Sequence, residues 1–177
     1  MPDLKLNVGC GEDYREGWVN LDACSLFKRD DSILLPDESL AKKFGRKSAD
    51  IVVARDIIEH FFRWDGLRVL ADFAEVLKFG GKLELMTPDL GKLITTALLP
   101  IGRKMELIRG AQGQAYGPGV EPEGLTGQAW RAYPDWFCHK YLWTEDELRT
   151  VLTGFGFKVG APRWQGPECM TLISTKE

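Results

Sequence analysis

Near its start the chain runs from an alternating apolar strand directly into two closely spaced glycines. The strand is Leu4-Lys5-Leu6-Asn7-Val8, and Gly9-Cys10-Gly11 follows it at once. Because such a glycine cluster forms a turn, the strand must end there. Trp18-Val19-Asn20-Leu21-Asp22 is typical of a second short strand that ends in an acid. Ligands of open parallel sheets bind beyond the carboxyl ends of the strands, so we expect the glycine turn and Asp22 at a binding site.

The rest of the chain alternates strands with helices. Residues 49–54 form a nearly continuous apolar run, which indicates a strand buried on both faces. From Asp65 the apolar residues follow helical spacing, and Gly80-Gly81 is expected to end that helix. Thr144 and Glu147 fit a capping box at the start of a later helix. Further strands are expected at residues 82–86, 157–159 and 169–174. This order predicts a Rossmann-like α/β fold, in which helices flank a mostly parallel sheet.

Residues 90–142 interrupt this alternation after the fifth strand. They contain weak helical patterns, a stretch rich in glycine and proline at residues 110–127, and then a group of aromatic residues. We find no second core, so residues 1–177 are expected to form a single domain. Long irregular segments inside compact domains are usually functional, which predicts that residues 90–142 form a lid or a substrate wall. The aromatic residues serve either that wall or the core.

The composition argues against several kinds of partner. The net charge is -3 and no dense basic block occurs, so we do not expect duplex nucleic acid as a partner. No apolar run is long enough to cross a bilayer. The four cysteines form no C-x-x-C pair and there is no signal-peptide pattern, which indicates a cytoplasmic protein. With only His60 and His139, an H-E-x-x-H zinc site cannot form, and we expect no metal centre.

The residues around the glycine turn indicate which nucleoside ligand fits there. Asp22 is placed to accept hydrogen bonds from two ribose hydroxyls. A dinucleotide fold needs a third glycine and a helix N-terminus for the pyrophosphate, but Glu12 and Asp13 stand where that helix should begin. Two carboxylates would repel a pyrophosphate in a low-dielectric pocket. S-adenosylmethionine carries no phosphate and bears positive charge, so it tolerates acids there.

Four segments together resemble the small class I S-adenosylmethionine-dependent methyltransferases, in particular the methyltransferase type 11-like group. They are Leu6-Asn7-Val8-Gly9-Cys10-Gly11, Gly17-Trp18-Val19-Asn20-Leu21-Asp22, Ile57-Ile58-Glu59-His60-Phe61 and Glu75-Val76-Leu77-Lys78-Phe79-Gly80-Gly81. The resemblance implies S-adenosylmethionine as cofactor, with Gly9 and Gly11 at its methionine part, Asp22 at its ribose, Asp31 near its adenine and Arg55 beside the pocket floor. Cys10, between the two glycines, is expected at the same binding site as a small packing residue. Two departures are Asn7, where many members have an acid for the cofactor ammonium group, and Glu12, where a small residue is usual.

The expected reaction is methyl transfer to an oxygen or nitrogen of a small-molecule acceptor. Two histidines, His60 and His139, are the candidates for a catalytic base. Asp56 and His60 would share a helix face, as a metal or acid-base pair or as a surface contact, and Glu59 either faces the substrate or is exposed. The alternatives are a non-catalytic S-adenosylmethionine-binding module and, less favoured, a nicotinamide-dependent dehydrogenase. The identity of the acceptor and the oligomeric state stay open.

Overall fold

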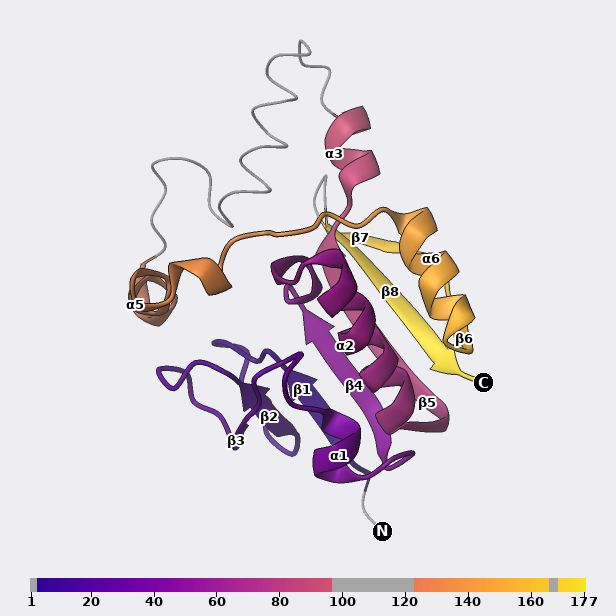
Figure 1. Cartoon of the computed structure of the whole chain (residues 1–177), viewed down its shortest axis with the longest axis horizontal. Helices are drawn as coiled ribbons and strands as arrows, with labels where there is room; N and C mark the ends of the chain where they lie inside the picture. Colours follow the sequence, from indigo (N-terminus) through magenta and orange to yellow (C-terminus); the bar gives the residue numbers. More distant parts are fainter. Residues whose placement is uncertain (1–2, 97–122, 166–168) are drawn as a thin grey trace.

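One mixed sheet organises the part of the chain that the computed structural model describes, residues 3–96, 123–165 and 169–177. Its strand order is β3-β2-β1-β4-β5-β8-β6, with β7 paired to β8 (Figure 1). The strands are β1 Lys5–Val8, β2 Val19–Asp22, β3 Asp31–Ser32, β4 Ala49–Arg55, β5 Leu77–Pro88, β6 Phe157–Val159, β7 Arg163–Gln165 and β8 Cys169–Lys176. The helices are α1 Leu40–Phe44, α2 Arg63–Val76, α3 Leu90–Thr96, α5 Gly124–Ala132 and α6 Glu145–Gly154, with 3-10 turns η1 Ile58–His60 and η2 Pro134–Trp136.

The sheet is parallel from β3 through to β5, and β8 reverses the direction. β1 lies between β2 and β4 in parallel register, and β4 pairs parallel with β5. β8 pairs antiparallel with β5, β6 and β7. The predicted mostly parallel α/β fold is therefore confirmed. The carboxyl ends of β1, β2, β4 and β5 meet at one edge, where ligands of such sheets bind.

The apolar core lies on one face of the sheet. Side chains along a strand alternate between faces, and here alternate apolar residues of β1, β4, β5 and β8 join one cluster with residues of α2 and α6. Its members include Leu6, Val8, Val52, Ala54, Phe73, Leu83, Leu85, Leu148, Leu152, Met170 and Leu172. Figure 1 shows α2 lying across β4 and β5. The intervening positions carry polar or charged residues such as Asn7, Arg55, Lys82 and Glu84. The expectation that residues 49–54 are buried on both faces thus holds only in part, because Ile51 is half-buried.

Two local predictions need correction. Gly80-Gly81 does not end α2, because the helix stops at Val76 and β5 begins at Leu77. Pairing shifts register between Ala49 and Ile51, so residues 78–81 form an irregular excursion within β5, and Gly80 supplies its left-handed turn with φ +79°. The capping box is half formed: the Thr144 hydroxyl accepts from the Glu147 N–H at 3.2 Å. The Glu147 carboxylate instead accepts hydrogen bonds from Arg63 and Tyr141.

The segment at residues 90–142 begins with α3 and returns through α5 and η2, whereas its residues 97–122 lie outside the described part. Trp143, which follows it, is fully buried. A Cβ on Gly66 of α2 would lie 2.9 Å from the Trp143 ring, so the glycine permits this close packing. Among the helices described, none is long and apolar enough to span a membrane.

Candidate functional site

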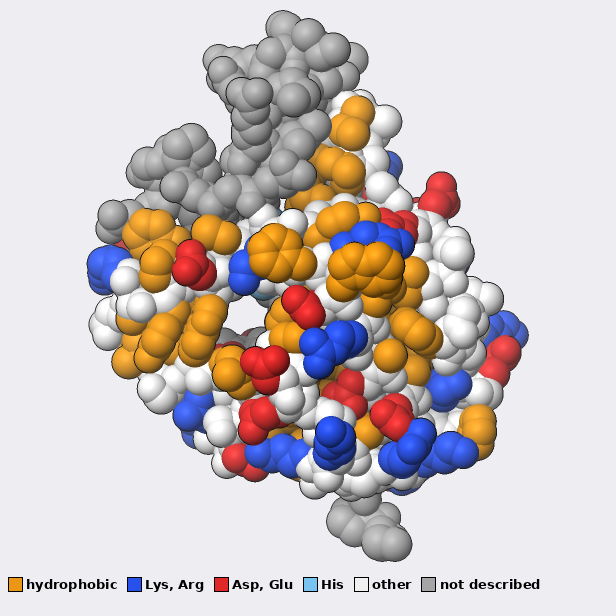
Figure 2. Space-filling model, viewed as in Figure 1, with side chains coloured by type: hydrophobic (Ala, Val, Ile, Leu, Met, Phe, Trp, Pro, Cys, Tyr) orange, Lys and Arg blue, Asp and Glu red, His pale blue; other side chains and the backbone are white. Residues whose placement is uncertain are grey.

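A cavity of about 660 Å³ opens at the carboxyl edge of the sheet. It is lined by the glycine turn after β1, the end of β2, the end of β4 and Met86 of β5. Residues Thr126, Trp136, Phe137 and Lys140 of the segment after β5 line it from the other side. Figure 2 shows the opening, bordered by hydrophobic and acidic side chains. The structure therefore brings the glycine turn and Asp22 to one cavity, as the strand-end argument predicted.

The glycine turn is shaped by two residues in the left-handed region. Gly9 has φ +65° and Gly11 has φ +49°. A Cβ on Gly9 would lie 2.3 Å from Cγ2 of Ile57, so only glycine lets the turn approach the segment after β4. Cys10 lies between them with its thiol buried. Burial, followed by the charge of Asp22, raises the pKa of the Cys10 thiol to about 12. Cys10 is consequently an uncharged packing group that lines the cavity.

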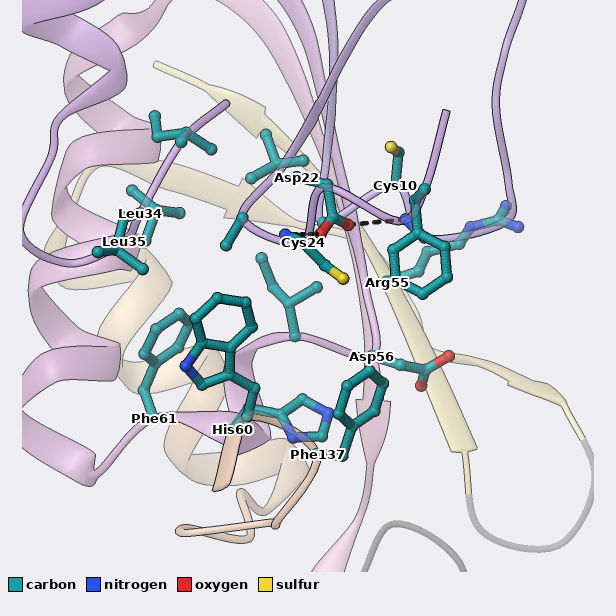
Figure 3. A pocket seen from close by; sticks show the side chains of 18 of the residues that line it. Cys10, Asp22, Cys24, Leu34, Leu35, Arg55, Asp56, His60, Phe61 and Phe137 are labelled. Carbon is teal, nitrogen blue, oxygen red and sulfur yellow. Dashed lines mark hydrogen bonds between the residues drawn. The ribbon is translucent and has the colours of Figure 1, made fainter. Parts of the chain in front are cut away.

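Asp22 is held in one orientation by the backbone. Its Oδ2 accepts from the Gly11 N–H and its Oδ1 from the Cys24 N–H, each at 2.8 Å (Figure 3). The side chain is buried, and this burial raises its pKa above the usual aspartate value. Each oxygen keeps acceptor capacity beyond its backbone bond. The carboxylate can therefore receive two further donors without moving.

A polar network, rather than a helix, supports the link from β1 to β2. The Asn7 amide donates to the Asp13 carbonyl at 2.6 Å and to Oδ1 of Asn20 at 3.0 Å. The Asn20 amide donates to the Arg15 carbonyl and to Asp30, at 2.9 Å each. Asn7 is buried within this network, so its amide N–H groups are already used. Asn7 therefore braces the turn.

The two acids after the glycine turn also have protein partners. Oε1 of Glu12 accepts from both the N–H and the hydroxyl of Thr126, at 2.9 and 2.7 Å, which ties the turn to α5. Asp13 pairs with Arg15 at 2.7 Å. Both side chains nevertheless line the cavity and add negative charge to its wall.

The predicted residues Asp31 and Arg55 lie in different places. Asp31 is exposed on β3, where it pairs with Lys43 at 2.8 Å, and it is not among the cavity residues. The apolar residues that follow it, Ile33 to Pro36, line the cavity instead. Arg55 does border the cavity, and its Nε donates to Glu84 of β5 at 2.8 Å. The structure thus brings Arg55, but not Asp31, to the site.

The two candidate histidines lie against each other. Their ring centroids are 4.9 Å apart in an edge-to-face arrangement. His60 lines the cavity next to Phe137 (Figure 3), whereas His139 is not among the lining residues. Burial, together with the neighbouring His139, lowers the pKa of His60 to about 4. The expected shared helix face of Asp56 and His60 is wrong, because only residues 58–60 form a short 3-10 turn and Asp56 precedes it with φ +51°.

The sequence left open whether Glu59 faces the substrate or is exposed, and the structure shows neither a surface position nor a place in the cavity lining. Glu59 is fully buried, and the Thr87 hydroxyl donates to its Oε2 at 3.0 Å. Burial, then the charge of Asp56, raises the pKa of Glu59 to about 8. The available signal was its position among the apolar residues Ile57, Ile58, Phe61 and Phe62, where an exposed carboxylate is out of place.

The aromatic residues divide between the two roles that the sequence left open. Trp136 and Phe137 line the cavity together with Phe61, and Trp136 stacks on Tyr133 with centroids 4.3 Å apart. Trp143 belongs to the core. Lys140 adds a positive charge to the same wall of the cavity. This wall of the cavity therefore combines aromatic side chains with the positive charge of Lys140, whereas Glu12 and Asp13 add negative charge beside the glycine turn.

No protein-family model matches the sequence, and no curated protein sequence matches it. Solved structures do resemble it in fold. An S-adenosylmethionine-dependent methyltransferase from Methanosarcina mazei aligns with a TM-score of 0.64 at 18% identity, over 98% of this chain and 92% of its own. Similar enzymes from Archaeoglobus fulgidus (TM-score 0.62, 15% identity, 98% and 86% of the two chains) and Mesorhizobium loti (0.61, 11%, 99% and 94%) also align. The chain thus has the fold of the class I S-adenosylmethionine-dependent methyltransferases.

Proposed function

We propose that this protein is a methyltransferase that moves the methyl group of S-adenosylmethionine to an oxygen or nitrogen of a small-molecule acceptor. The observation that carries the proposal is the Asp22 carboxylate, fixed by Gly11 and Cys24 at the edge of a cavity in a fold that resembles solved methyltransferases. The fold alone does not determine an activity, so the proposal rests on this site.

The residues around the cavity fit the parts of this donor. Asp22 offers acceptor positions for the two ribose hydroxyls, and the apolar run from Ile33 to Pro36 supplies a surface for adenine. The positive φ of Gly9 and Gly11 lets the backbone approach the methionine part. The carboxylates of Glu12 and Asp13 favour a cationic ligand and disfavour a diphosphate. Such an arrangement supports S-adenosylmethionine over a dinucleotide.

The protein's contribution to the reaction is alignment. When bound, S-adenosylmethionine supplies a methyl carbon on a positive sulfur. A lone pair of the acceptor would form a bond to that carbon while the carbon–sulfur bond breaks, and the electrons of the broken bond would stay on sulfur. Holding the reactants in line can supply about 7–11 kcal/mol of the barrier. Phe61, Trp136 and Phe137 would position the acceptor and exclude water, and Lys140 would favour an acceptor that carries negative charge. On this proposal residues 123–142, which include Trp136, Phe137 and Lys140, cover the acceptor.

Of the two histidines, His60 borders the cavity and His139 lies behind it. A ring whose pKa is about 4 is neutral at physiological pH and binds a proton weakly. This weakens the expectation that His60 acts as the general base and leaves it with a free lone pair.

Calorimetric titration of the full chain with S-adenosylhomocysteine tests the donor assignment. Hydrogen bonds to a charged group are worth about 1.5–3 kcal/mol each, so losing two in Asp22→Ala should weaken binding by about 100-fold or more. Asp31→Ala is the matched control, because this exposed strand-end acid lies outside the cavity and should leave affinity unchanged. Equal affinity of wild type and Asp22→Ala would contradict the ribose assignment, and a response to NAD would favour a dehydrogenase.

Turnover separates an enzyme from a binding module. The wild-type chain, incubated with methyl-labelled donor and fractionated small-molecule extracts, should transfer label to at least one fraction, and mass spectrometry identifies the methylated product. Tight donor binding with no transfer to any fraction would favour the non-catalytic module. A cytoplasmic location and the absence of duplex nucleic acid as partner stay predictions.

A further inference from the structure

Three side chains with metal-ligand chemistry meet at the wall of the cavity. One ligand atom from each of Glu59, His60 and His139 lies within 4.8 Å of the others. Glu59 and His60 belong to η1, whereas His139 comes from the segment after η2. The Glu59 carbonyl accepts backbone hydrogen bonds from Lys140 at 2.8 Å and Tyr141 at 3.2 Å. These bonds hold the two distant segments together, so the cluster is part of the fold.

The Glu59 carboxylate lacks part of its expected bonding. It is fully buried, and only Oε2 has a described donor, the hydroxyl of Thr87. Oε1 has no hydrogen-bond partner among the residues that the structure describes. A buried carboxylate oxygen without a donor is costly unless a proton or a cation meets it. This atom therefore points to something that the protein chain does not itself supply.

The His60 ring is oriented as a metal ligand would be. Its Nδ1 lies 3.3 Å from the Cys138 carbonyl, and because a carbonyl oxygen can only accept, Nδ1 must carry the proton. The lone pair is then on Nε2. Metal-binding histidines typically donate their other ring N–H to such a carbonyl, and ligating carboxylates receive hydrogen bonds as Glu59 does from Thr87.

We propose that Glu59, His60 and His139 bind one divalent first-row transition-metal ion. Two imidazoles and one carboxylate suit zinc and its neighbours, and a three-residue set leaves positions open for a further ligand. Tetrahedral zinc sites place ligand atoms roughly 3.4 Å apart, so small side-chain rotations would close the cluster around an ion. This differs from the sequence-based expectation of no metal centre. That expectation considered only closely spaced motifs, and the third ligand here comes from a distant segment.

The role of the ion rests on the proposed function, whereas its binding does not. Because His60 lines the cavity, an open coordination position would face the acceptor. A hydroxyl of the acceptor bound there would lose its proton to water more readily, and its oxygen lone pair would then form the bond to the methyl carbon. The two histidines would serve as ligands, and no side-chain base would be needed.

Metal titration of the purified full chain, without methyl donor, tests the proposal. After chelator treatment and desalting, wild type should bind one equivalent of Co²⁺ with a visible absorption band, and Zn²⁺ should displace it. His60→Gln and His139→Gln should each weaken binding by at least about 100-fold. Asp31→Ala is the control: it removes an exposed acid outside the cavity and outside the proposed ligand set, and it should bind like wild type. Circular dichroism checks that each variant is folded.

A second measurement uses wild type alone, in case a variant fails to fold. Zn²⁺ should protect both His60 and His139 from diethyl pyrocarbonate, as read from peptide mass spectra. The proposal is overturned if folded wild type binds neither Co²⁺ nor Zn²⁺, or if both glutamine variants bind as tightly as wild type. Since no donor is present, this failure is distinct from a failure to bind S-adenosylhomocysteine.

Discussion

Replacing Gly9 with alanine tests the packing that creates the glycine turn. The new Cβ would lie 2.3 Å from Cγ2 of Ile57, and the residue would keep φ +65°. A left-handed conformation costs a non-glycine residue about 1–2 kcal/mol, and inserting a methyl into a filled space costs about 1–3 kcal/mol. We therefore expect Gly9→Ala to lower the free energy of unfolding by about 3 kcal/mol. Urea denaturation measures this directly, and the thermal midpoint should fall by roughly 6–12 °C.

Two comparisons separate the steric cost from a general effect of alanine. At Gly154, the last residue of α6, an added Cβ would meet no atom within 4 Å and φ is not positive, so Gly154→Ala should be neutral or slightly stabilising. In the double variant Gly9→Ala with Ile57→Ala the clash is removed, so the combined loss should be smaller than the sum of the two single losses by at least about 1 kcal/mol. Strict additivity, or equal stability of Gly9→Ala and Gly154→Ala, would show that contact with Ile57 does not determine the cost.

Three further predictions concern single side chains. Asp72→Ala should lower the free energy of unfolding by about 2 kcal/mol in urea denaturation, because this carboxylate accepts two backbone N–H groups and the Ser39 hydroxyl at the start of α1. Glu75→Ala on the same helix breaks an exposed ion pair and should cost under about 1 kcal/mol, so equal losses would contradict the capping role of Asp72. Cys10 should be alkylated about a thousandfold more slowly in the folded than in the urea-unfolded protein, because its pKa is raised from 9.0 to about 12 and only the thiolate reacts. Comparable alkylation rates in the two states, measured by mass spectrometry, would contradict the burial of this thiol. Affinity for S-adenosylhomocysteine should fall as the pH is lowered, beginning above the ordinary aspartate pKa, because the raised pKa means that Asp22 is protonated, and loses acceptor capacity for the ribose, at a higher pH than an exposed aspartate. Calorimetry should show a weaker pH dependence for Asp22→Asn, and a profile identical to wild type would exclude Asp22 as the cause.

Local pattern was sufficient to predict most of the sheet and the position of the glycine turn and Asp22 at its carboxyl edge. The strands at residues 5–8, 19–22 and 49–55 follow from alternation and β-branching, and Asp22 was found because a strand end has a known place in a parallel sheet. The prediction at Gly80-Gly81 failed because helix and strand join without a loop, and the glycines serve an irregularity inside β5 instead.

The acceptor side depends on contacts between distant segments. His60 and His139 lie against each other where Lys140 and Tyr141 donate to the Glu59 carbonyl, and no periodicity in the sequence predicts this pairing. Asp31 was assigned by resemblance, yet its exposed pair with Lys43 depends on where α1 packs. Such outcomes are decided by tertiary structure, which short motifs do not specify.

The network around Asn20 means that the glycine turn and the β1–β2 link are supported by amides and carboxylates, where a helix would usually provide apolar packing. Apolar packing tolerates a change of side-chain shape if the volume is kept, but a buried hydrogen-bond network needs a partner for every donor and acceptor. An amide at residue 20 serves the turn, the strand and the loop at Asp30 at once. Because the β1–β2 link is short and polar, we expect the cavity end of the sheet to tolerate even isosteric substitutions poorly, whereas the apolar core should tolerate them better.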